Sequence, residues 1–153
     1  MPQQLSLNDF LPYRCVTLAE RISTALSQIY AEKFGVTVAE WRILTTLAEH
    51  DRLQARDVGL IIKMDKVKVS RAVTSLLDRK LLLRAPSKRD GRAADLSLSA
   101  AGKRLYEKIV PQALQWEQLL VDPLTAAQQT VLFELLDKLD QRVTELEGPL
   151  TTA

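Results

Sequence analysis

The sequence predicts a mainly α-helical fold with one small β-hairpin. Apolar residues recur at helical spacing over most of the chain, whereas two short apolar runs flank a single polar loop, SKRDGR. Gly and Pro account for only 11 of 153 residues and charged residues for 26%, which argues against disorder. We therefore expect four helices, a hairpin and two further helices, with enough chain for one domain or two small lobes.

The first two helices are predicted by spacing and by capping residues. Residues 9–33 carry apolar side chains at the i, i+3, i+4, i+7 spacing of an amphipathic helix, and Gly35 is expected to end it. Thr37, followed three residues later by Glu40, has the pattern of a capping box. That box predicts a second helix over residues 37–49.

The centre of the chain predicts two shorter helices and the hairpin. Helices are expected over residues 55–62 and 66–80, and short strands over residues 81–86 and 94–98. The polar loop between the two strands predicts the hairpin turn.

Two long helices are predicted at the C-terminal end. Ser99 is expected to cap a helix that reaches about Val121, and Thr125 to open a last helix with an apolar stripe. Gly148 and Pro149 are expected to end that last helix.

Positive charge is concentrated in one third of the chain. Residues 52–104 hold 14 Lys and Arg against 5 Asp and Glu, a net charge of +9, whereas the remainder holds 7 against 14, a net charge of −7. Such asymmetry is typical of a protein in which one segment binds a polyanion and the rest has another role. A merely solvated basic face is the alternative.

Winding residues 66–80 at 100° per residue places Arg71 at the centre of one face. That face suits the DNA major groove, because arginine can bond guanine, hydroxyls can bond phosphates or base edges, and valine can meet a thymine methyl group. An ordinary surface helix is the alternative. The face also carries Val67, Lys68, Thr74 and Ser75, and the opposite, packing face carries Val69, Val73, Leu76 and Leu77.

The hairpin loop is also basic. Lys88, Arg89 and Arg92 lie at its tip, where they can reach phosphates or enter the narrow minor groove. Asp90 is expected to orient an arginine by a charge-assisted hydrogen bond. A polar turn without a ligand is the alternative, since Asp and Gly are common turn residues.

The runs MDKVKVSRAVTSLLDRK, RDGR and LSLSAAG resemble the winged helix-turn-helix of the MarR family (multiple antibiotic resistance regulators). TVAEWRIL and the C-terminal helix pair fit the same family, so the resemblance covers nearly the whole chain. It implies a symmetric dimer with a helical dimerisation lobe of residues 1–36 and 99–153. Residues 37–98 would form the DNA-binding lobe, with the helix over residues 66–80 in the major groove and the hairpin loop in the minor groove.

Eight residues are expected to bind or organise DNA. Four of them match positions of the family motif, and four rest on helix or loop geometry alone. The first group is Ser70, Arg71, Asp90 and Arg92, and the second is Lys66, Lys68, Thr74 and Arg89.

Two positions depart from the family pattern. Leu81 stands where the family often has glycine after the recognition helix, and a left-handed conformation there would cost roughly 1 to 2 kcal/mol. Gly59 stands where the family usually has alanine, at a cost of up to about 1 kcal/mol of helix propensity. Neither removes a DNA contact, but both bear on the local turn geometry.

Catalytic residues, metal ligands and cofactors are not expected. One histidine, His50, and one cysteine, Cys15, cannot build the usual nucleophile and base pairs or a metal cluster. The N-terminal MPQQLSLNDF lacks the regions of a signal peptide, and no apolar run is long enough to span a membrane. We therefore expect a non-enzymatic cytoplasmic protein without a membrane partner.

The resemblance also implies a small-molecule effector. MarR-like regulators commonly bind small aromatic acids in a cleft between the two lobes, and binding there weakens the affinity for DNA. Tyr13 and Trp41 can supply aromatic walls, and Arg14 and Arg42 a carboxylate partner. The alternative is that both rings pack and both arginines are solvated.

Cys15 lies where some MarR-like peroxide sensors carry a reactive cysteine, and the neighbouring Arg14 can stabilise a thiolate. A thiol-based redox sensor is therefore an alternative function. Because Cys15 falls on the apolar stripe of residues 9–33, a buried structural cysteine is the preferred interpretation.

The expected function is a homodimeric regulator, a repressor that binds a pseudo-palindromic operator in double-stranded DNA and is released by a small effector. A protein-interaction module and a non-specific architectural DNA binder stay open as alternatives. Phosphate binding weakens with salt whereas an apolar interface barely responds, and the ratio of specific to non-specific affinity separates the two kinds of DNA binder.

Overall fold

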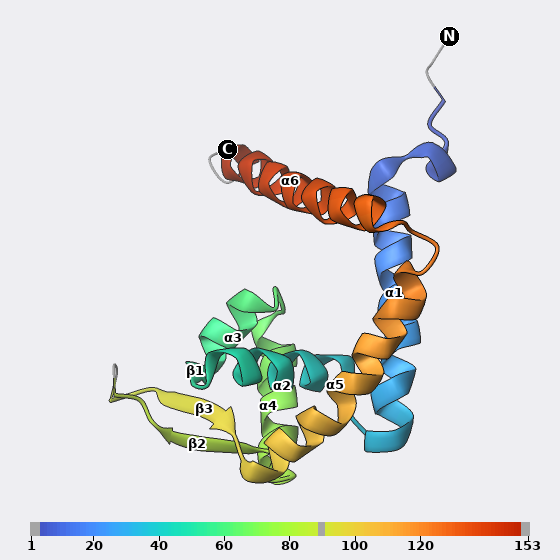
Figure 1. The fold of residues 1–153 in the computed structure, drawn as a ribbon. Helices are drawn as coiled ribbons and strands as arrows, with labels where there is room; N and C mark the ends of the chain where they lie inside the picture. Colours follow the sequence, from blue (N-terminus) through green and yellow to red (C-terminus); the bar gives the residue numbers. More distant parts are fainter. Residues whose placement is uncertain (1–3, 89–90, 151–153) are drawn as a thin grey trace. The chain divides into compact units, whose positions relative to one another are not determined.

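The computed structural model describes residues 4–88 and 91–150 of the chain (Figure 1). It confirms the predicted mainly helical fold with a small sheet. The chain divides into two compact units, with the boundary after Ala113, inside the fifth α-helix. The elements are, in order, a short 3-10 helix η1 (Leu7–Asp9), α1 (Leu11–Phe34), α2 (Val38–His50), β1 (Leu53–Gln54), α3 (Ala55–Ile61), α4 (Lys66–Asp78), β2 (Leu82–Pro86), β3 (Ala94–Leu98), α5 (Ala100–Val121) and α6 (Ala126–Leu150).

The junction of α1 and α2 forms as the sequence predicts. Gly35 adopts a left-handed conformation with φ of 61°, and its N–H bonds to the carbonyls of Ala31 and Tyr30, which is how glycine ends a helix. The Thr37 hydroxyl accepts from the N–H of Glu40 at 3.2 Å, and the Glu40 carboxylate accepts from the N–H of Thr37 at 2.8 Å. The capping box is therefore confirmed.

Three strands form one antiparallel sheet in the order β1-β3-β2. β2 and β3 are the predicted hairpin, with Leu82 opposite Leu98 and Pro86 opposite Ala94. β1 (Leu53–Gln54) pairs with β3 and was not predicted. Two residues are too few to show a periodicity, so this strand is recognisable only by its pairing.

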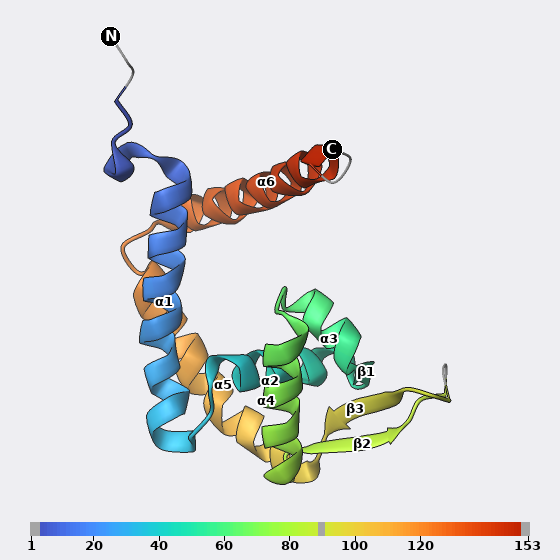
Figure 2. The ribbon, with the colours of Figure 1, turned by 180° about the vertical axis from the view of Figure 1, so that it is seen from behind.

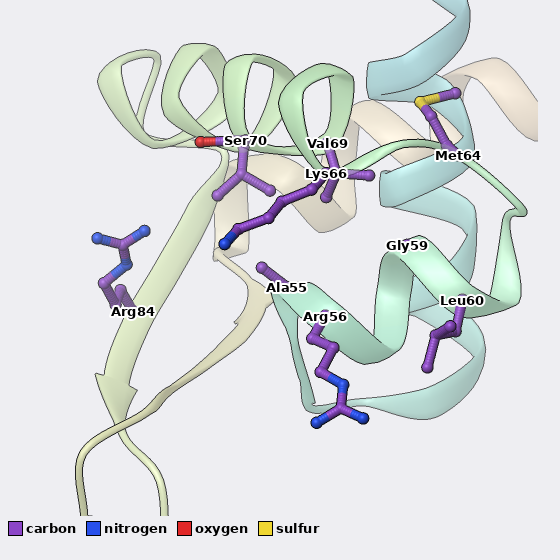
Figure 3. Close-up of a pocket in the computed structure, with 10 residues that line it drawn as sticks. Ala55, Arg56, Gly59, Leu60, Met64, Lys66, Val69, Ser70 and Arg84 are labelled. Atoms are coloured by element: carbon purple, nitrogen blue, oxygen red, sulfur yellow. The ribbon is translucent and has the colours of Figure 1, made fainter.

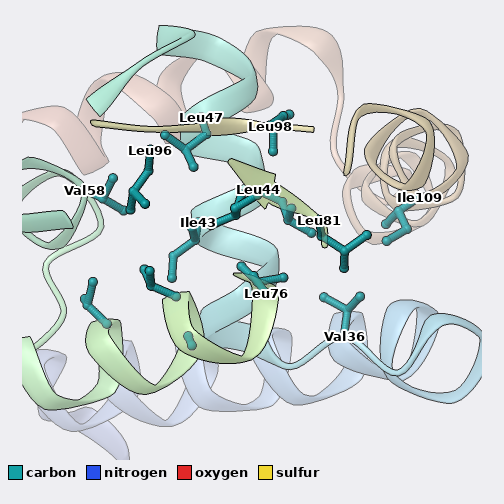
Figure 4. Packing of buried hydrophobic residues seen from close by; sticks show 14 of the residues in the cluster. Val36, Ile43, Leu44, Leu47, Val58, Leu76, Leu81, Leu96, Leu98 and Ile109 are labelled. Atoms are coloured by element: carbon teal, nitrogen blue, oxygen red, sulfur yellow. The ribbon is translucent and has the colours of Figure 1, made fainter. Parts of the chain in front are cut away.

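The hydrophobic core surrounds α2 (Figure 4). Ile43 and Leu44 of α2 are fully buried, and Leu76 of α4 and Leu96 of β3 are among the side chains that gather around them. α4 packs on α2 and α3, and Figure 2 shows these helices from behind with the hairpin extending from them. The core therefore holds α4 with one face directed inward.

The turn after α4 differs from the prediction. α4 ends at Asp78, two residues earlier than expected, and Lys80 adopts the left-handed conformation, with φ of 58°. Leu81 is buried, and its N–H bonds to the carbonyl of Leu76 at 2.9 Å. Leu81 therefore does not adopt the costly left-handed conformation: it packs in the core, and the exposed Lys80 takes the left-handed position instead.

Ser99 caps α5, as predicted. Its hydroxyl accepts from the N–H of Gly102 at 2.9 Å and donates to the carbonyl of Lys80 at 2.7 Å. A Cβ atom on Gly102 would lie 2.0 Å from the backbone carbonyl oxygen of Leu81. Glycine at this position therefore allows the start of α5 to lie against the backbone that follows α4.

The second unit contains the end of α5 and all of α6. Thr125 opens α6, since its hydroxyl accepts from the N–H of Gln128 and its own N–H donates to the Gln128 side chain. α6 continues to Leu150, so the prediction that Gly148 and Pro149 end it was wrong. Proline in the last turn has a helical φ and removes only one backbone hydrogen bond.

Candidate nucleic-acid interface

α4 begins at an aspartate cap. The Asp65 carboxylate accepts a hydrogen bond from the backbone N–H of Lys68 at 3.0 Å, as an N-cap side chain does. This hydrogen bond is the main cause that lowers the pKa of Asp65, and the positive charge of Lys68, 3.7 Å away, lowers it further. The first turn of α4 is thus ordered by its own sequence.

The two faces of α4 separate as the sequence predicts. Val69, Val73 and Leu76 are buried, whereas the opposite face is exposed, with Val67 59% exposed. Positive charge, hydroxyls and one valine therefore meet solvent on one side, the mixture that can bond phosphates and base edges in a major groove. The predicted contact residues exposed on α4 are Lys66, Lys68, Ser70, Arg71 and Thr74.

Ser75 does not belong to the exposed face, contrary to the prediction. It is half-buried, and its hydroxyl donates to the Glu40 carboxylate at 2.6 Å. Helical winding placed Ser75 at the edge of the exposed face, where the packing of α2 decides which way the side chain turns. The Ser75 hydroxyl therefore belongs to the contact between α2 and α4 and not to the candidate interface.

The β2–β3 hairpin adds further positive charge. Lys88 and Arg92, on either side of its loop, are exposed. Arg89 and Asp90 lie outside the described residues, so their roles stay predictions. The described part of the hairpin is therefore compatible with a basic loop that reaches a phosphate or a minor groove.

Two arginines that the sequence reasoning missed lie near α4. Arg56 of α3 and Arg84 of β2 line a cavity of about 430 Å³ together with Lys66 of α4 (Figure 3). The net charge of residues 52–104 includes both arginines, but only tertiary packing brings them beside α4. Three cations from three elements thus gather at one edge of the candidate interface. The apolar part of the lining consists of Ala55, Gly59, Leu60, Met64, Val69 and Val73.

The four predicted effector residues lie on two helices. Tyr13 and Arg14 are exposed near the start of α1, and Arg42 is exposed on α2. Trp41 contacts Tyr30, 17 residues after Tyr13 along α1, and the helical rise makes that about 25 Å. One chain therefore does not bring all four residues together.

Trp41 is half-buried rather than exposed. Its ring stacks with those of Tyr30 and Tyr106, with centroid distances of 5.5 and 5.9 Å. Burial raises the pKa of Tyr30, and the nearby Arg42 guanidinium opposes that rise. The three rings form an aromatic stack that joins α1, α2 and the first part of α5.

Cys15 is exposed in the single chain, so the preferred interpretation of a buried cysteine was wrong here. Its apolar stripe on α1 is uncovered, with Leu11 and Leu18 each 54% exposed. The periodicity predicted an apolar face correctly, but no described residue of the same chain covers it at this point. The redox-sensing alternative therefore stays open.

The described residues show no metal site and no membrane span. Within residues 4–88 and 91–150, no group of three His, Cys, Asp or Glu side chains lies close enough to hold a metal ion. None of the described helices is both long and apolar enough to cross a membrane. His50, at the end of α2, is partly exposed and lies 3.9 Å from the Glu49 carboxylate.

The part of the chain that carries this interface is similar in sequence to a known protein family. Residues 34–93, which include α2, α3, α4 and β2, match the family model described as the MarR family. Over residues 34–93 the chain is similar to the MarR family. Its fold is the winged helix-turn-helix fold of MarR-family transcriptional regulators. No curated protein is significantly similar to it in sequence.

Solved structures extend the MarR-family likeness to most of the chain. A MarR/EmrR family transcriptional regulator from Acinetobacter sp. ADP1 is 28% identical, with a TM-score of 0.84 over 92% of this chain and 99% of that chain. BpsR of Bordetella bronchiseptica, whose DNA binding is regulated by 6-hydroxynicotinic acid, is 22% identical, with a TM-score of 0.81 over 90% and 98%. S. aureus MepR, solved in complex with DNA, is 21% identical, with a TM-score of 0.79 over 90% and 99%.

Proposed function

We propose that this protein is a MarR-family transcriptional regulator, a homodimeric repressor that binds a pseudo-palindromic operator in double-stranded DNA. α4 would lie in the major groove and the β2–β3 loop in the minor groove. The exposed face of α4 carries the proposal, because it presents cations and hydroxyls on a helix whose other face is anchored in the core. The proposed DNA-binding residues are Lys66, Lys68, Ser70, Arg71, Thr74, Arg89, Asp90 and Arg92.

The partner that we propose for the exposed apolar faces of α1 and α6 is a second copy of the chain. Residues 1–36 and 99–153 would form the dimerisation lobe, and residues 37–98 the DNA-binding lobe. Exposed apolar surface of this extent is typical of protein interfaces, and two-fold symmetry would place two half-sites about one helical turn apart. The exposed apolar side chains of α6 include Val131, Leu132, Phe133, Leu135, Leu136, Leu139, Val143 and Leu146.

A small aromatic acid is the effector class that we propose. Regulation of BpsR by 6-hydroxynicotinic acid supports this class. Arg14 and Arg42 would pair with the carboxylate, and Tyr13 and Trp41 would contact the ring. One copy in the dimer would supply Tyr13 and Arg14, and the other copy would supply Trp41 and Arg42. The ligand would favour a dimer whose α4 helices no longer match the half-site spacing. We propose no catalytic role, since regulators of this family are generally non-enzymatic.

Arg71→Ala tests the base-reading role. Fluorescence anisotropy would compare a duplex from the intergenic region beside the gene with a shuffled duplex at one salt concentration. Loss of a bidentate contact to guanine should lower the operator-to-shuffled affinity ratio by roughly 10-fold to 100-fold. Equal loss of affinity for both duplexes would overturn the base-reading role.

Two further variants separate charge from base recognition. Arg104→Ala removes the same charge from the exposed surface of α5 and should leave the affinity ratio unchanged. Arg92→Ala should weaken binding to both duplexes, because a hairpin-loop arginine contacts backbone or groove rather than one base. Wild-type binding that does not weaken with salt would favour the protein-interaction module instead.

A further inference from the structure

A buried carboxylate stands between α4 and the turn that joins α1 to α2. Glu40, in the first turn of α2, is only 3% exposed. Each of its oxygens has a partner, so the charge is hydrogen-bonded although water is excluded. The donors are the backbone N–H of Thr37 at 2.8 Å, the hydroxyl of Ser75 at 2.6 Å and the guanidinium of Arg79 at 3.4 Å.

Arg79 ties the end of α4 to the end of α1. Its guanidinium donates to the carbonyls of Gly35 at 3.0 Å and Phe34 at 3.1 Å. These carbonyls lie at the C-terminal end of α1, where helix carbonyls lack backbone partners and a cation is favourable. One side chain therefore links α1, the Glu40 carboxylate of α2 and α4.

This network fixes the orientation of α4 more than it adds to the net stability of the fold. A buried ion pair is often no more stable than apolar side chains of the same volume, because desolvation offsets the attraction. Hydrogen bonds need short distances and defined angles, whereas apolar packing is non-directional. The hydrogen bond from Ser75 to Glu40 therefore constrains the rotation of α4 about its own axis. The two hydrogen bonds from Arg79 to backbone carbonyls constrain the position of α4 along that axis.

The network and the candidate DNA face lie on the same short helix. Ser75 follows Arg71 by four residues, about one helical turn. A rotation of α4 that breaks the bond from Ser75 to Glu40 would also redirect Arg71. Hydrogen bonds to base edges tolerate small displacements poorly, whereas contacts to phosphates carry no sequence information.

We propose that Glu40 is a positioning residue of the DNA site, which acts through Ser75 and Arg79 to hold α4 at the rotation that base recognition requires. The inference rests on the proposed function, in which α4 reads DNA. Glu40 needs no contact with DNA for this role. Loss of the network should lower sequence discrimination while binding to unrelated DNA is kept.

Ser75→Ala in the full-length chain tests the inference with the same two duplexes. The operator-to-shuffled affinity ratio should fall roughly fivefold to tenfold, the size expected for one hydrogen bond, with unchanged affinity for the shuffled duplex. Ser75→Thr keeps the hydroxyl and should restore the ratio. Glu40→Gln replaces one acceptor oxygen by an amide that cannot accept, and should lower the ratio at least as far.

Thr46→Ala is the matched control. Thr46 is a buried residue of α2 whose hydroxyl donates to the carbonyl of Arg42 in the same helix at 2.8 Å, so this variant should lower Tm with an unchanged ratio. An equal fall in the ratio for this control would assign the loss to stability and overturn the inference. If Ser75→Ala and Glu40→Gln both keep the wild-type affinity ratio, the inference about Glu40 is overturned, whereas the proposal that α4 binds DNA is not affected. A wild type without any preference between the duplexes would overturn the proposed function, and the inference with it.

Discussion

The winged-helix part of the chain (here residues 30–109) and α6 are both built from amphipathic helices, yet only the first covers its apolar face. The buried apolar side chains of the described residues all lie between Tyr30 and Ile109. In α6, by contrast, Leu135 and Leu136 are 51% and 50% exposed, and no described residue is buried. A periodic pattern therefore predicts that a face will pack, but not which chain supplies the partner.

The difference separates two sources of stability. The winged-helix part holds α4 with contacts from its own core, so the apolar face of α4 is covered within the same chain. The α6 helix, with its uncovered apolar face, would be stabilised by the proposed association, and that contribution would depend on protein concentration. Variants in the two regions should therefore fail in different ways.

The largest effect is expected when charge is placed on the apolar face of α6. Leu135→Asp with Leu136→Asp would bury unpaired carboxylates in the proposed dimer, each at a cost of several kcal/mol. The dissociation constant of the dimer should rise by at least about 100-fold, since every 1.4 kcal/mol is tenfold. Sedimentation or size-exclusion chromatography with light scattering measures the change.

Gln141→Asp on the polar side of α6 is the control for that variant and should remain dimeric. Helical content should stay measurable in both, because the winged-helix part keeps its own core. A doubly substituted protein that stays dimeric would show that another surface mediates association. A wild type that is monomeric at all concentrations would break the comparison between the two regions.

Gly102→Ala should be the most damaging single change inside the winged-helix part. The added Cβ would lie 2.0 Å from the Leu81 carbonyl oxygen, and a backbone neighbour cannot turn aside as a side chain can. The free energy of unfolding should fall by about 3 kcal/mol, the upper end of overpacking effects. Urea denaturation measures it, and an unchanged midpoint would show that α5 can shift away from Leu81.

Gly59→Ala should act in the opposite direction and provides a matched control of the same chemistry. Its Cβ would lie 3.4 Å from the Met64 carbonyl oxygen and from Val69 Cγ2, at ordinary contact distance. Helix propensity in α3 should then raise the free energy of unfolding by up to about 1 kcal/mol. Destabilisation in the same urea experiment would mean that the neighbours of Gly59 do not yield.

The smallest effect is expected at the start of α4 and depends on pH. The folded state lowers the pKa of Asp65, so its stabilising contribution is complete above the ordinary carboxylate pKa and is lost as the pH falls through the lowered value. Asp65→Ala should therefore lower Tm at neutral pH and lower it less in acid. Asp65→Asn keeps a capping oxygen and should fall between the wild type and Asp65→Ala at neutral pH. A Tm difference between wild type and Asp65→Ala that does not shrink in acid would exclude a charge contribution.

The part of the candidate interface that depends on residues close together in the sequence was predictable. The spacing of Val69, Val73 and Leu76 predicts the buried face of α4, and therefore that Arg71 points away from the core. Arg56 and Arg84 were missed, because their approach to α4 is set by packing between segments distant in sequence. Ser75 was misplaced for the same reason, since the carboxylate that binds it comes from α2.

Local signals along the chain were enough to predict where the helices begin and which of their faces are apolar. Gly35, the Thr37 capping box and the Ser99 cap act within a few residues, so their consequences are readable without a fold. Three features instead depend on the folded chain: the pairing of β1, the left-handed conformation of Lys80 and the exposure of Cys15 in the single chain. Each of these depends on which distant surface is available to pair with, and a local pattern carries no information about that surface.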